Sequence, residues 1–158
     1  MLDELISFLS ALRTSQTICY KRMHAGVSAP MCATRFSAGS DLRSNEDITL
    51  LPHKSALVHT GLCLKIPEHF FLDIRPRSGL ALKHGVTVLN TPATIDSDYR
   101  GEIMVLLYNT GDAPFVIRRG DRIAQALLMR RYEVTWKPVK ALDETERGVH
   151  GFGSSGVL

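Results

Sequence analysis

The stretch that decides the fold is GVTVLNTPATIDSDYRGE, residues 85–102. It opens with a run of β-branched and apolar residues at 85–89, breaks at Pro92, and resumes at 94–95. Proline lacks a backbone N–H and disfavours helix in the residue before it, so the break ends a strand. The chain then returns as an apolar run at 102–108. Two strand-forming runs joined by turn-forming residues predict a β-hairpin with an irregular, bulged tip.

The residues that could do chemistry lie at this tip. A bulge leaves backbone N–H and C=O groups unpaired, so they could bind a flat polar ligand. Asp96 supplies a carboxylate and Tyr99 an aromatic face. Taken alone, residues 96–101 are better explained as a polar turn. Only the other motifs of the chain favour a binding site.

Composition indicates one globular domain in a reducing compartment such as the cytoplasm. The chain has 158 residues, of which 44% are hydrophobic, so it can bury a core without covalent staples. Its net charge is only +3 and mixed along the chain, which argues against a nucleic-acid partner. The cysteines Cys19, Cys32 and Cys63 are odd in number and lack CxxC spacing, which disfavours a disulfide framework or a zinc site. No apolar run approaches the roughly 20 residues that cross a bilayer, so no membrane partner is expected.

The chain divides into an N-terminal extension at 1–16, a β domain at 17–140 and a C-terminal tail at 141–158. The extension is acidic rather than basic at its start, unlike a secretory signal, and has apolar residues at helical spacing. We expect a short amphipathic helix with no catalytic role, whose apolar positions are Leu2, Leu5, Ile6, Leu9 and Leu12. The tail is polar and rich in glycine, so it is expected to be mobile.

Short strand-forming runs separated by proline and glycine, with almost no helical periodicity, predict an all-β sandwich or barrel. Residues 26–35 are expected to form a loop. The strands outside the hairpin are expected at 17–24, 47–51, 55–64, 70–75, 115–117 and 122–129, with a weaker one at 132–136.

Five segments in fixed order, taken together, resemble the trimeric dUTP pyrophosphatase (dUTPase) family. They are AGSDL at 38–42, RPRSG at 75–79, the hairpin at 85–102, GDRIAQ at 120–125, and RGVHGFGSSG at 147–156. The resemblance runs from about Tyr20 to the C-terminus. It implies a distorted jelly-roll (β-clip) barrel and a homotrimer whose active sites are shared among the subunits. It also implies hydrolysis of dUTP to dUMP and pyrophosphate, which limits uracil in DNA and supplies dUMP for thymidylate synthesis.

The segment at 75–79 resembles the part of the family that holds the triphosphate. Arg77 offers a guanidinium, Ser78 a hydroxyl, and Gly79 lets an anion approach the backbone N–H groups. Without the resemblance, a plain turn is the commoner structure for such a tetrapeptide. The family match also makes Gln125 a ligand near the α-phosphate. A satisfied interface amide is the alternative, because an amide in an apolar strand needs partners.

The hairpin tip resembles the family's uracil and sugar site. Asn90 stands where the family carries its uracil-reading asparagine. The backbone of Thr94, Ile95 and Asp96, and that near Met104, completes the contacts to the base. A site built to pair with uracil rejects cytosine, whose edge would leave buried donors and acceptors unpaired. Tyr99, by its family role, packs on the deoxyribose and excludes a 2′-hydroxyl, although a purely structural tyrosine is the alternative.

The resemblance makes Asp96 the catalytic residue, which holds and deprotonates the attacking water. It implies Mg²⁺ as the cofactor, held mainly by substrate phosphates because this ion prefers oxygen ligands and keeps several waters. Asp41 is expected to reach the ion only through water, and a turn aspartate is the alternative there. The family usually has an aromatic or aliphatic residue where this chain has Ser40.

The tail resembles the family's lid. Arg147 would pair with the γ-phosphate and Phe152 would stack on the uracil, while Gly153, Ser154 and Ser155 would wrap the phosphates. His150 and Ser155 depart from the usual glycine and threonine.

Three other functions are compatible with this fold class. The related dCTP deaminase uses a glutamate in the central strand against C4 of cytosine, and ammonia release from dCTP would separate it from a dUTPase. An interaction module with the same fold, but without catalysis, should have lost Asp96, Tyr99 or the tail. This chain keeps all three. A regulatory protein that also hydrolyses dUTP is a further alternative, and it would contact its partner through the N-terminal helix.

Overall fold

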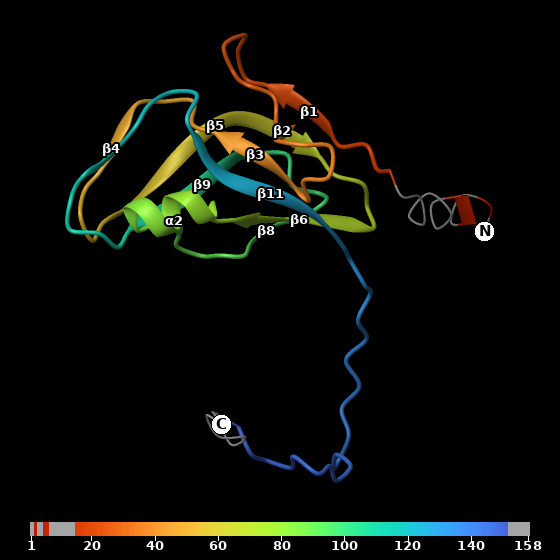
Figure 1. The fold of residues 1–158 in the computed structure, drawn as a ribbon. Coiled ribbons are helices and arrows are strands. Elements are labelled where there is room, and N and C mark those ends of the chain that lie inside the picture. The colour runs from red at the N-terminus through yellow and green to blue at the C-terminus, as the bar shows by residue number, and fades with distance from the viewer. Residues whose placement is uncertain (1, 3–4, 7–14, 152–158) are drawn as a thin grey trace.

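The computed structural model describes residues 2, 5–6 and 15–151. Within this part, two larger sheets face each other and a small third sheet closes one end (Figure 1). Leu2, Leu5 and Ile6 are helical and exposed, and the other positions of the expected N-terminal helix lie outside the described residues. No helix of the described residues is long and apolar enough to span a membrane.

One larger sheet has four strands in the order β1-β5-β9-β7. Their bounds are β1 Cys19–Arg22, β5 Ser55–Lys65, β7 Val86–Val88 and β9 Glu102–Asn109. The other has five strands in the order β2-β3-β11-β6-β8. Their bounds are β2 Met31–Cys32, β3 Gly39–Arg43, β6 Phe70–Arg75, β8 Ala93–Ile95 and β11 Arg122–Arg130. The small sheet pairs β4 Ile48–Leu50 with β10 Phe115–Ile117.

The core lies between the two larger sheets because each contributes one apolar face. In β9 every second residue is buried, so Ile103, Val105 and Leu107 point inward. Leu72 and Ile74 of β6 approach from the opposite sheet. Full burial of such side chains stabilises the fold by about 1.5–3 kcal/mol each. The expected all-β fold is confirmed.

The predicted hairpin is confirmed in its strands but wrong at its tip. β7 and β9 pair antiparallel, with Val88 opposite Leu107. β8, however, leaves this sheet and pairs with β6, with Ile95 opposite Leu72. The tip is therefore a crossover between sheets rather than a bulge in one ladder. The half-buried Ile95 packs on the core, which favours the crossover.

A short helix, α2 Ser78–His84, was not expected from the sequence. It ends at Gly85, whose φ of 65° closes the helix with backbone hydrogen bonds to Ala81 and Leu80. A Cβ at Gly85 would also lie 2.7 Å from Thr110 Oγ1. This position therefore needs glycine both for its positive φ and for the lack of space beside it. Only seven residues long, α2 is too short for periodicity to reveal.

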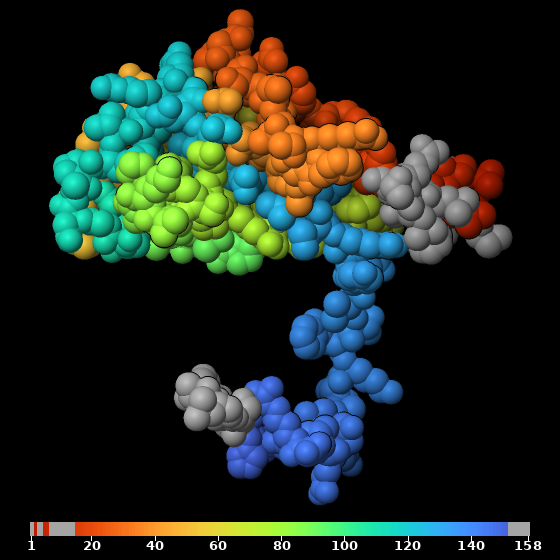
Figure 2. All heavy atoms as spheres, in the orientation of Figure 1, coloured from red at the N-terminus to blue at the C-terminus, as the bar shows by residue number. Residues whose placement is uncertain are grey.

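Two further differences concern the ends of the domain. The loop expected at 26–35 contains the short edge strand β2. The weak strand expected at 132–136 is not formed. No described residue after Arg130 is in a strand or helix, and this segment leaves the body (Figures 1 and 2).

Candidate active site

A polar row crosses the outer face of the five-stranded sheet. Gln125 at the centre of β11 lies opposite Asp41 of β3 on one side and Arg75 of β6 on the other. Residues directly opposite in an antiparallel sheet share a face, so these three side chains line up. Arg75 Nη2 donates to Asp73 Oδ2 at 2.8 Å. Three of the family-like motifs thus meet in one row, and Gln125 has polar neighbours there, as an amide in an apolar strand requires.

Asp41 joins three of the motifs. Arg122 Nη1 donates to its Oδ2 at 3.3 Å, and Arg77 Nε lies 3.4 Å from its Oδ1. Arg77 Nη1 also donates to the backbone oxygen of Arg122 at 3.0 Å. Asp41 is only 5% exposed, so its charge needs these cationic partners. Its role in this structure is to hold Arg77 and Arg122 in place.

The segment expected to hold the triphosphate begins α2. Arg77 is the N-cap residue, with extended backbone, and Ser78 and Gly79 are the first helical residues and are exposed. The first N–H groups of a helix have no partner within it. A Cβ at Gly79 would meet no atom within 4 Å among the described residues. The packing of this chain therefore does not require glycine there, whereas close approach of a ligand would.

Next to Arg77 the surface is hollowed by a cavity of about 400 Å³, which we call the arginine hollow. Its lining residues come from β3, from α2 and its N-cap, from β10, and from β11 with the turn before it. They are Arg43, Arg77, Leu80, Phe115, Ile117, Gly120, Asp121, Arg122 and Ile123. Arg43 Nη1 donates to the Gly120 oxygen at 2.5 Å, which fixes one wall. Three arginines against Asp121 give this hollow a cationic lining that suits an anionic ligand.

Asp96 lines a second cavity, of about 470 Å³, which we call the aspartate hollow. Its lining residues are Phe70, Phe71, Thr94, Asp96, Ser97, Asp98 and Arg131. Asp96 directly follows β8 and is exposed. The two hollows share no lining residue, so in this one chain Asp96 and Arg77 belong to separate surfaces.

The tip loop, residues 96–101, is braced by its own hydrogen bonds. Tyr99 N donates to the Asp96 oxygen at 3.2 Å. Arg100 Nη1 donates to the backbone oxygens of Ser97 at 2.6 Å and Tyr99 at 2.8 Å. Tyr99 Oη donates to the Glu102 backbone oxygen at 3.0 Å, and the residue is 42% exposed. The loop therefore presents Asp96 and Tyr99 in a defined arrangement.

The residues expected to contact uracil lie around an open strand edge. β8 is the edge strand of its sheet, so one side of the Thr94–Ile95 backbone has no strand partner among the described residues. The Ile95 side chain packs on the core, which leaves its backbone for recognition. Asn90 is exposed after β7, and Met104 lies half-buried in β9 opposite His59.

A histidine–glutamate pair fixes the end of the tip loop, and sequence reasoning missed it. Glu102 accepts from His59 Nδ1 at 2.8 Å and from Gly61 N at 2.7 Å. The hydrogen bond to Glu102 raises the pKa of His59 above its ordinary 6.5; slight burial opposes this, and the charges of Glu102 and Glu46 add to it. Burial raises the pKa of Glu102, but the bonds from His59, Gly61 and Thr60 outweigh it, so the pKa lies below 4.5.

Other residues of the hollows were also missed. Arg122 and Arg43 line the arginine hollow, and Arg131 lines the aspartate hollow. Arg122 stands inside the GDRIAQ motif, where its charge beside a strand could have marked it. Arg131 follows the last strand and carries no such signal.

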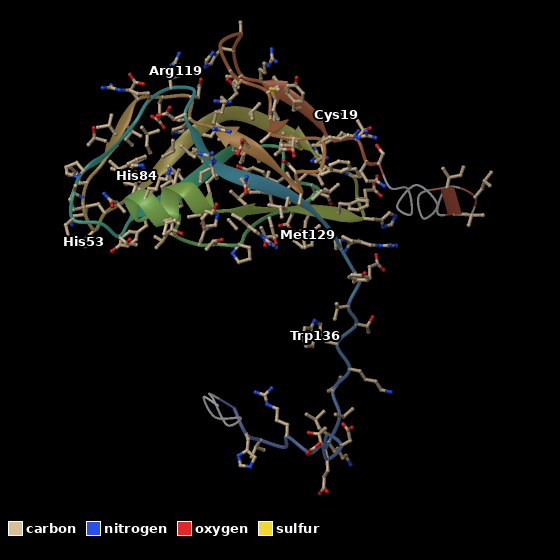
Figure 3. The ribbon with its side chains drawn as sticks, in the orientation of Figure 1. Cys19, His53, His84, Arg119, Met129 and Trp136 are labelled. Atoms are coloured by element: carbon tan, nitrogen blue, oxygen red, sulfur yellow. The ribbon has the colours of Figure 1, made fainter. Side chains whose placement is uncertain are left out.

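The tail is described as far as Gly151. Arg147 is exposed, and its Nε donates to the His150 oxygen at 2.9 Å, so here it contacts its own tail. Figure 3 shows Trp136 and the tail extending away from the sheets. The expected lid residues Phe152, Gly153, Ser154 and Ser155 lie outside the described residues.

The described residues do not form a preformed site for Mg²⁺. They contain no group of three or more His, Cys, Asp or Glu side chains placed to hold a metal. Asp41 Oδ1 accepts no hydrogen bond, yet the Arg77 charge lies beside it. A magnesium ion would therefore depend on oxygens that a ligand brings.

Comparison with known proteins agrees with this architecture. The sequence model of the dUTPase family matches residues 26–156. The chain is 48% identical to the deoxyuridine 5′-triphosphate nucleotidohydrolase of Treponema denticola over 87% of this chain and 97% of that protein. It is 46% identical to that of Caulobacter vibrioides over 94% of this chain and 100% of that protein. The solved structure of the Staphylococcus bacteriophage 80alpha dUTPase with dUpNHpp superposes with a TM-score of 0.83 at 26% identity, covering 90% of this chain and 100% of that one. The family match spans all five motifs, including those that meet at Asp41, and the chain therefore belongs to the dUTPase family of nucleotidohydrolases.

Proposed function

We propose that this enzyme hydrolyses dUTP to dUMP and pyrophosphate by attack of water on the α-phosphorus. The observation that carries the proposal is the position of Asp96. It is an exposed carboxylate that directly follows an edge strand and lines a hollow, and its backbone oxygen accepts from the N–H of Tyr99. The relatives of this protein are named as deoxyuridine 5′-triphosphate nucleotidohydrolases, and the solved phage enzyme contains dUpNHpp. A carboxylate, a flat ring and a free strand edge suit water activation, a sugar and a base.

Asp96 is proposed to orient one water and take its proton while the water oxygen bonds to the α-phosphorus. The bond from this phosphorus to the oxygen that bridges the α- and β-phosphates breaks, and pyrophosphate leaves. Phosphoryl chemistry of this kind depends mainly on positioning and charge neutralisation. A single placed carboxylate is therefore sufficient as the protein's base.

The triphosphate is proposed to bind at Arg77, Ser78, Gly79 and Gln125. The support is the placement of Arg77, whose guanidinium is held by Asp41 and the Arg122 oxygen beside a cationic hollow. Ser78 and Gly79 are exposed and begin the helix, and the first N–H groups of a helix have no partner within it. Mg²⁺ would arrive on the phosphates, where it would neutralise charge, with Asp41 as the nearest candidate for a contact through water.

Uracil is proposed to pair with the free edge of β8, with Asn90, and with the backbone near Met104. The deoxyribose is proposed to lie on Tyr99. Because the Tyr99 hydroxyl is already bonded to the Glu102 oxygen, the ring has little freedom to move away from an added 2′-hydroxyl. Pairing with the base edge would reject cytosine, as an unpaired buried group is costly.

We infer a homotrimer with shared sites. The two hollows share no lining residue, so a complete site needs groups from more than one copy if both bind the same nucleotide. In addition, residues 132–136 alternate polar and apolar, and Tyr132 and Trp136 are 75% and 90% exposed. An alternating segment that leaves its own body is suited to pairing with the sheet edge of another copy.

The tail is proposed to close over bound nucleotide, with Arg147 on the γ-phosphate and Phe152 on the base. Gly153, Ser154 and Ser155 would wrap the phosphates. The support is that Arg147 has only a backbone partner among the contacts of the described tail, so its charge is available. The enzyme is proposed to limit uracil incorporation into DNA and to supply dUMP for thymidylate synthesis. The three cysteines of the chain are free, which fits a reducing compartment such as the cytoplasm.

Pyrophosphate release measured across dUTP, dTTP, dCTP and UTP tests the proposal. We expect turnover of dUTP alone at micromolar substrate. Ammonia release from dCTP would instead assign the chain to the deaminase reaction. Absence of turnover with every nucleotide would remove the enzymatic proposal.

A further inference from the structure

The ladder between β5 and β9 is interrupted beside the tip loop. His59 pairs with Met104, and the next paired residues are Cys63 and Glu102, so β5 has extra residues between them. Gly61 lies in this bulge with φ of 71°. A Cβ on it would be 2.5 Å from Val27 Cγ2, so the bulge requires glycine.

Glu102 ties this bulge to the tip loop. Its Oε1 accepts from the Gly61 N–H at 2.7 Å and its Oε2 from His59 Nδ1 at 2.8 Å. Its backbone oxygen accepts from Tyr99 Oη at 3.0 Å. The Glu102 side chain is only 16% exposed, whereas that of His59 is 49% exposed. One residue therefore connects the β5 bulge to the Tyr99 ring.

The Tyr99 ring has little room to move. Its hydroxyl and ring atoms occupy the space beside Gly101, where an added Cβ would lie 2.3 Å from Oη. The ring is thus held between Gly101 and the Glu102 oxygen. A shift of the start of β9 would move both of these contacts together.

We propose that Glu102, anchored by His59 and Gly61 across the β5 bulge, is a positioning residue that sets the Tyr99 ring and thereby the preference for deoxyribose over ribose. This rests on the proposed placement of the sugar on Tyr99. Glu102 acts through Tyr99 and makes no contact with substrate itself.

The charges around His59 make this device sensitive to pH. Glu102 faces it from β9, and Glu46, in the segment before β4, accepts its backbone N–H at 2.8 Å. On the far side of the bulge, His24 Nε2 lies 2.9 Å from Asn45 Nδ2. When His59 loses its proton, its ion pair with Glu102 becomes a hydrogen bond from a neutral imidazole to the carboxylate, which holds Glu102 less firmly.

The test compares kcat/KM for dUTP with that for UTP between pH 6 and pH 9. Both nucleotides carry the same base and triphosphate, so the ionisation of those groups cancels in the ratio. For the unaltered enzyme we expect the ratio to fall about three- to tenfold as His59 deprotonates, the scale of one weakened charge-assisted bond. His59→Gln keeps a donor but no titratable charge and should give a low, flat profile. Glu102→Gln should also lower the ratio.

The chain offers a matched control in a second histidine–carboxylate pair. His53 Nε2 lies 3.1 Å from Asp112 Oδ1, between loops at the other end of β9. The two ends of β9, Glu102 and Asn109, are seven residues apart, so the two histidine–carboxylate pairs are separated by about 23 Å of strand. His53→Gln and Asp112→Asn should leave the ratio and its pH profile unchanged.

The outcomes separate this inference from the proposed function. If the unaltered enzyme does not hydrolyse dUTP, the function fails. If it does, and Tyr99→Ala lowers the ratio while His59→Gln behaves like His53→Gln, the inference is wrong. His59 is half-exposed, so its replacement should not prevent folding, and circular dichroism of each variant confirms this. If Glu102→Gln does not fold, the pH profile of His59→Gln by itself tests the inference.

Discussion

A Cβ placed on Gly101 would lie 2.3 Å from the hydroxyl oxygen of Tyr99 and 2.5 Å from Cζ. The absence of a side chain at residue 101 is therefore what allows the Tyr99 ring to take its place beside the tip loop. The same hydroxyl donates to the Glu102 oxygen, so both contacts together orient the ring.

Gly101→Ala should displace the Tyr99 ring and lower kcat/KM for dUTP about tenfold or more. The side chain of alanine would occupy the space that the Tyr99 ring fills next to residue 101. Steady-state kinetics check this. Gly120→Ala is not a suitable control because its φ is 92°, whereas Gly26→Ala adds a Cβ that makes only an ordinary contact, 3.5 Å from His24 Nδ1. Equal activity of Gly101→Ala and the unaltered enzyme would contradict the proposed role of Tyr99.

Asp96→Asn should lower turnover by roughly 10²- to 10⁴-fold, the range of a lost general base. The amide has nearly the same shape as the carboxylate but is a poor base, so dUTP should still bind. Rapid-quench turnover and calorimetric binding measure the two effects separately. Asp112→Asn, at an exposed carboxylate that lines neither hollow, is the control. Near-normal turnover of Asp96→Asn would remove Asp96 from its role.

The His59–Glu102 pair should stabilise the fold most between about pH 4.5 and pH 6.5. The pKa of His59 is raised in the folded state, so its contribution is complete below 6.5 and is lost as pH rises through the folded pKa. The pKa of Glu102 is lowered, so its contribution is complete above 4.5 and is lost as pH falls through the folded pKa.

Thermal unfolding of the unaltered enzyme and of Glu102→Gln from pH 3 to pH 9 measures this contribution. Protein concentration must be constant, because assembly shifts the midpoint. The difference in midpoint should be largest in the stated window and smaller on both sides. A difference that does not vary with pH would show that the pair has no titration-linked role.

Removal of the residues after Glu146 should strongly reduce turnover and leave the sheets folded. The truncation removes Arg147 and Phe152 but none of the core. Phe152→Ala should fall between the truncation and the full chain, since base–aromatic stacking contributes about 1–3 kcal/mol. Hydrogen exchange of the tail with and without dUpNHpp gives a direct readout. Equal protection in both states would mean that the tail is not a lid.

The full chain should be a trimer by light scattering, and Trp136→Ala should weaken the assembly. The Trp136 side chain is 90% exposed in the single chain, so its burial requires another copy. Leu82→Ala, at an exposed leucine on α2, is the comparison. Mixing Asp96→Asn with the tail-deleted chain should restore some activity. A fully active monomer would contradict shared sites.

The sequence by itself determined most of the strands and the family. The apolar run at 102–108 predicted β9 because strand-forming residues follow a cluster of turn-forming ones. The bounds of β6 and β10 were predicted as observed, since proline and glycine punctuate both ends. The order of the motifs predicted a dUTPase before any contact was known.

Only the tertiary structure decided which of these segments meet. Asp41 and Arg122 are 81 positions apart, and β8 leaves its hairpin for the opposite sheet because Ile95 finds the core there. The helix α2 and the bond from His59 to Glu102 depend on neighbours brought by other strands. Periodicity indicates which residues are buried, but it does not indicate which other segment they pack against. Register, crossover and ion pairing are set by the free energy of contacts between distant segments, so they follow only when the whole chain has folded.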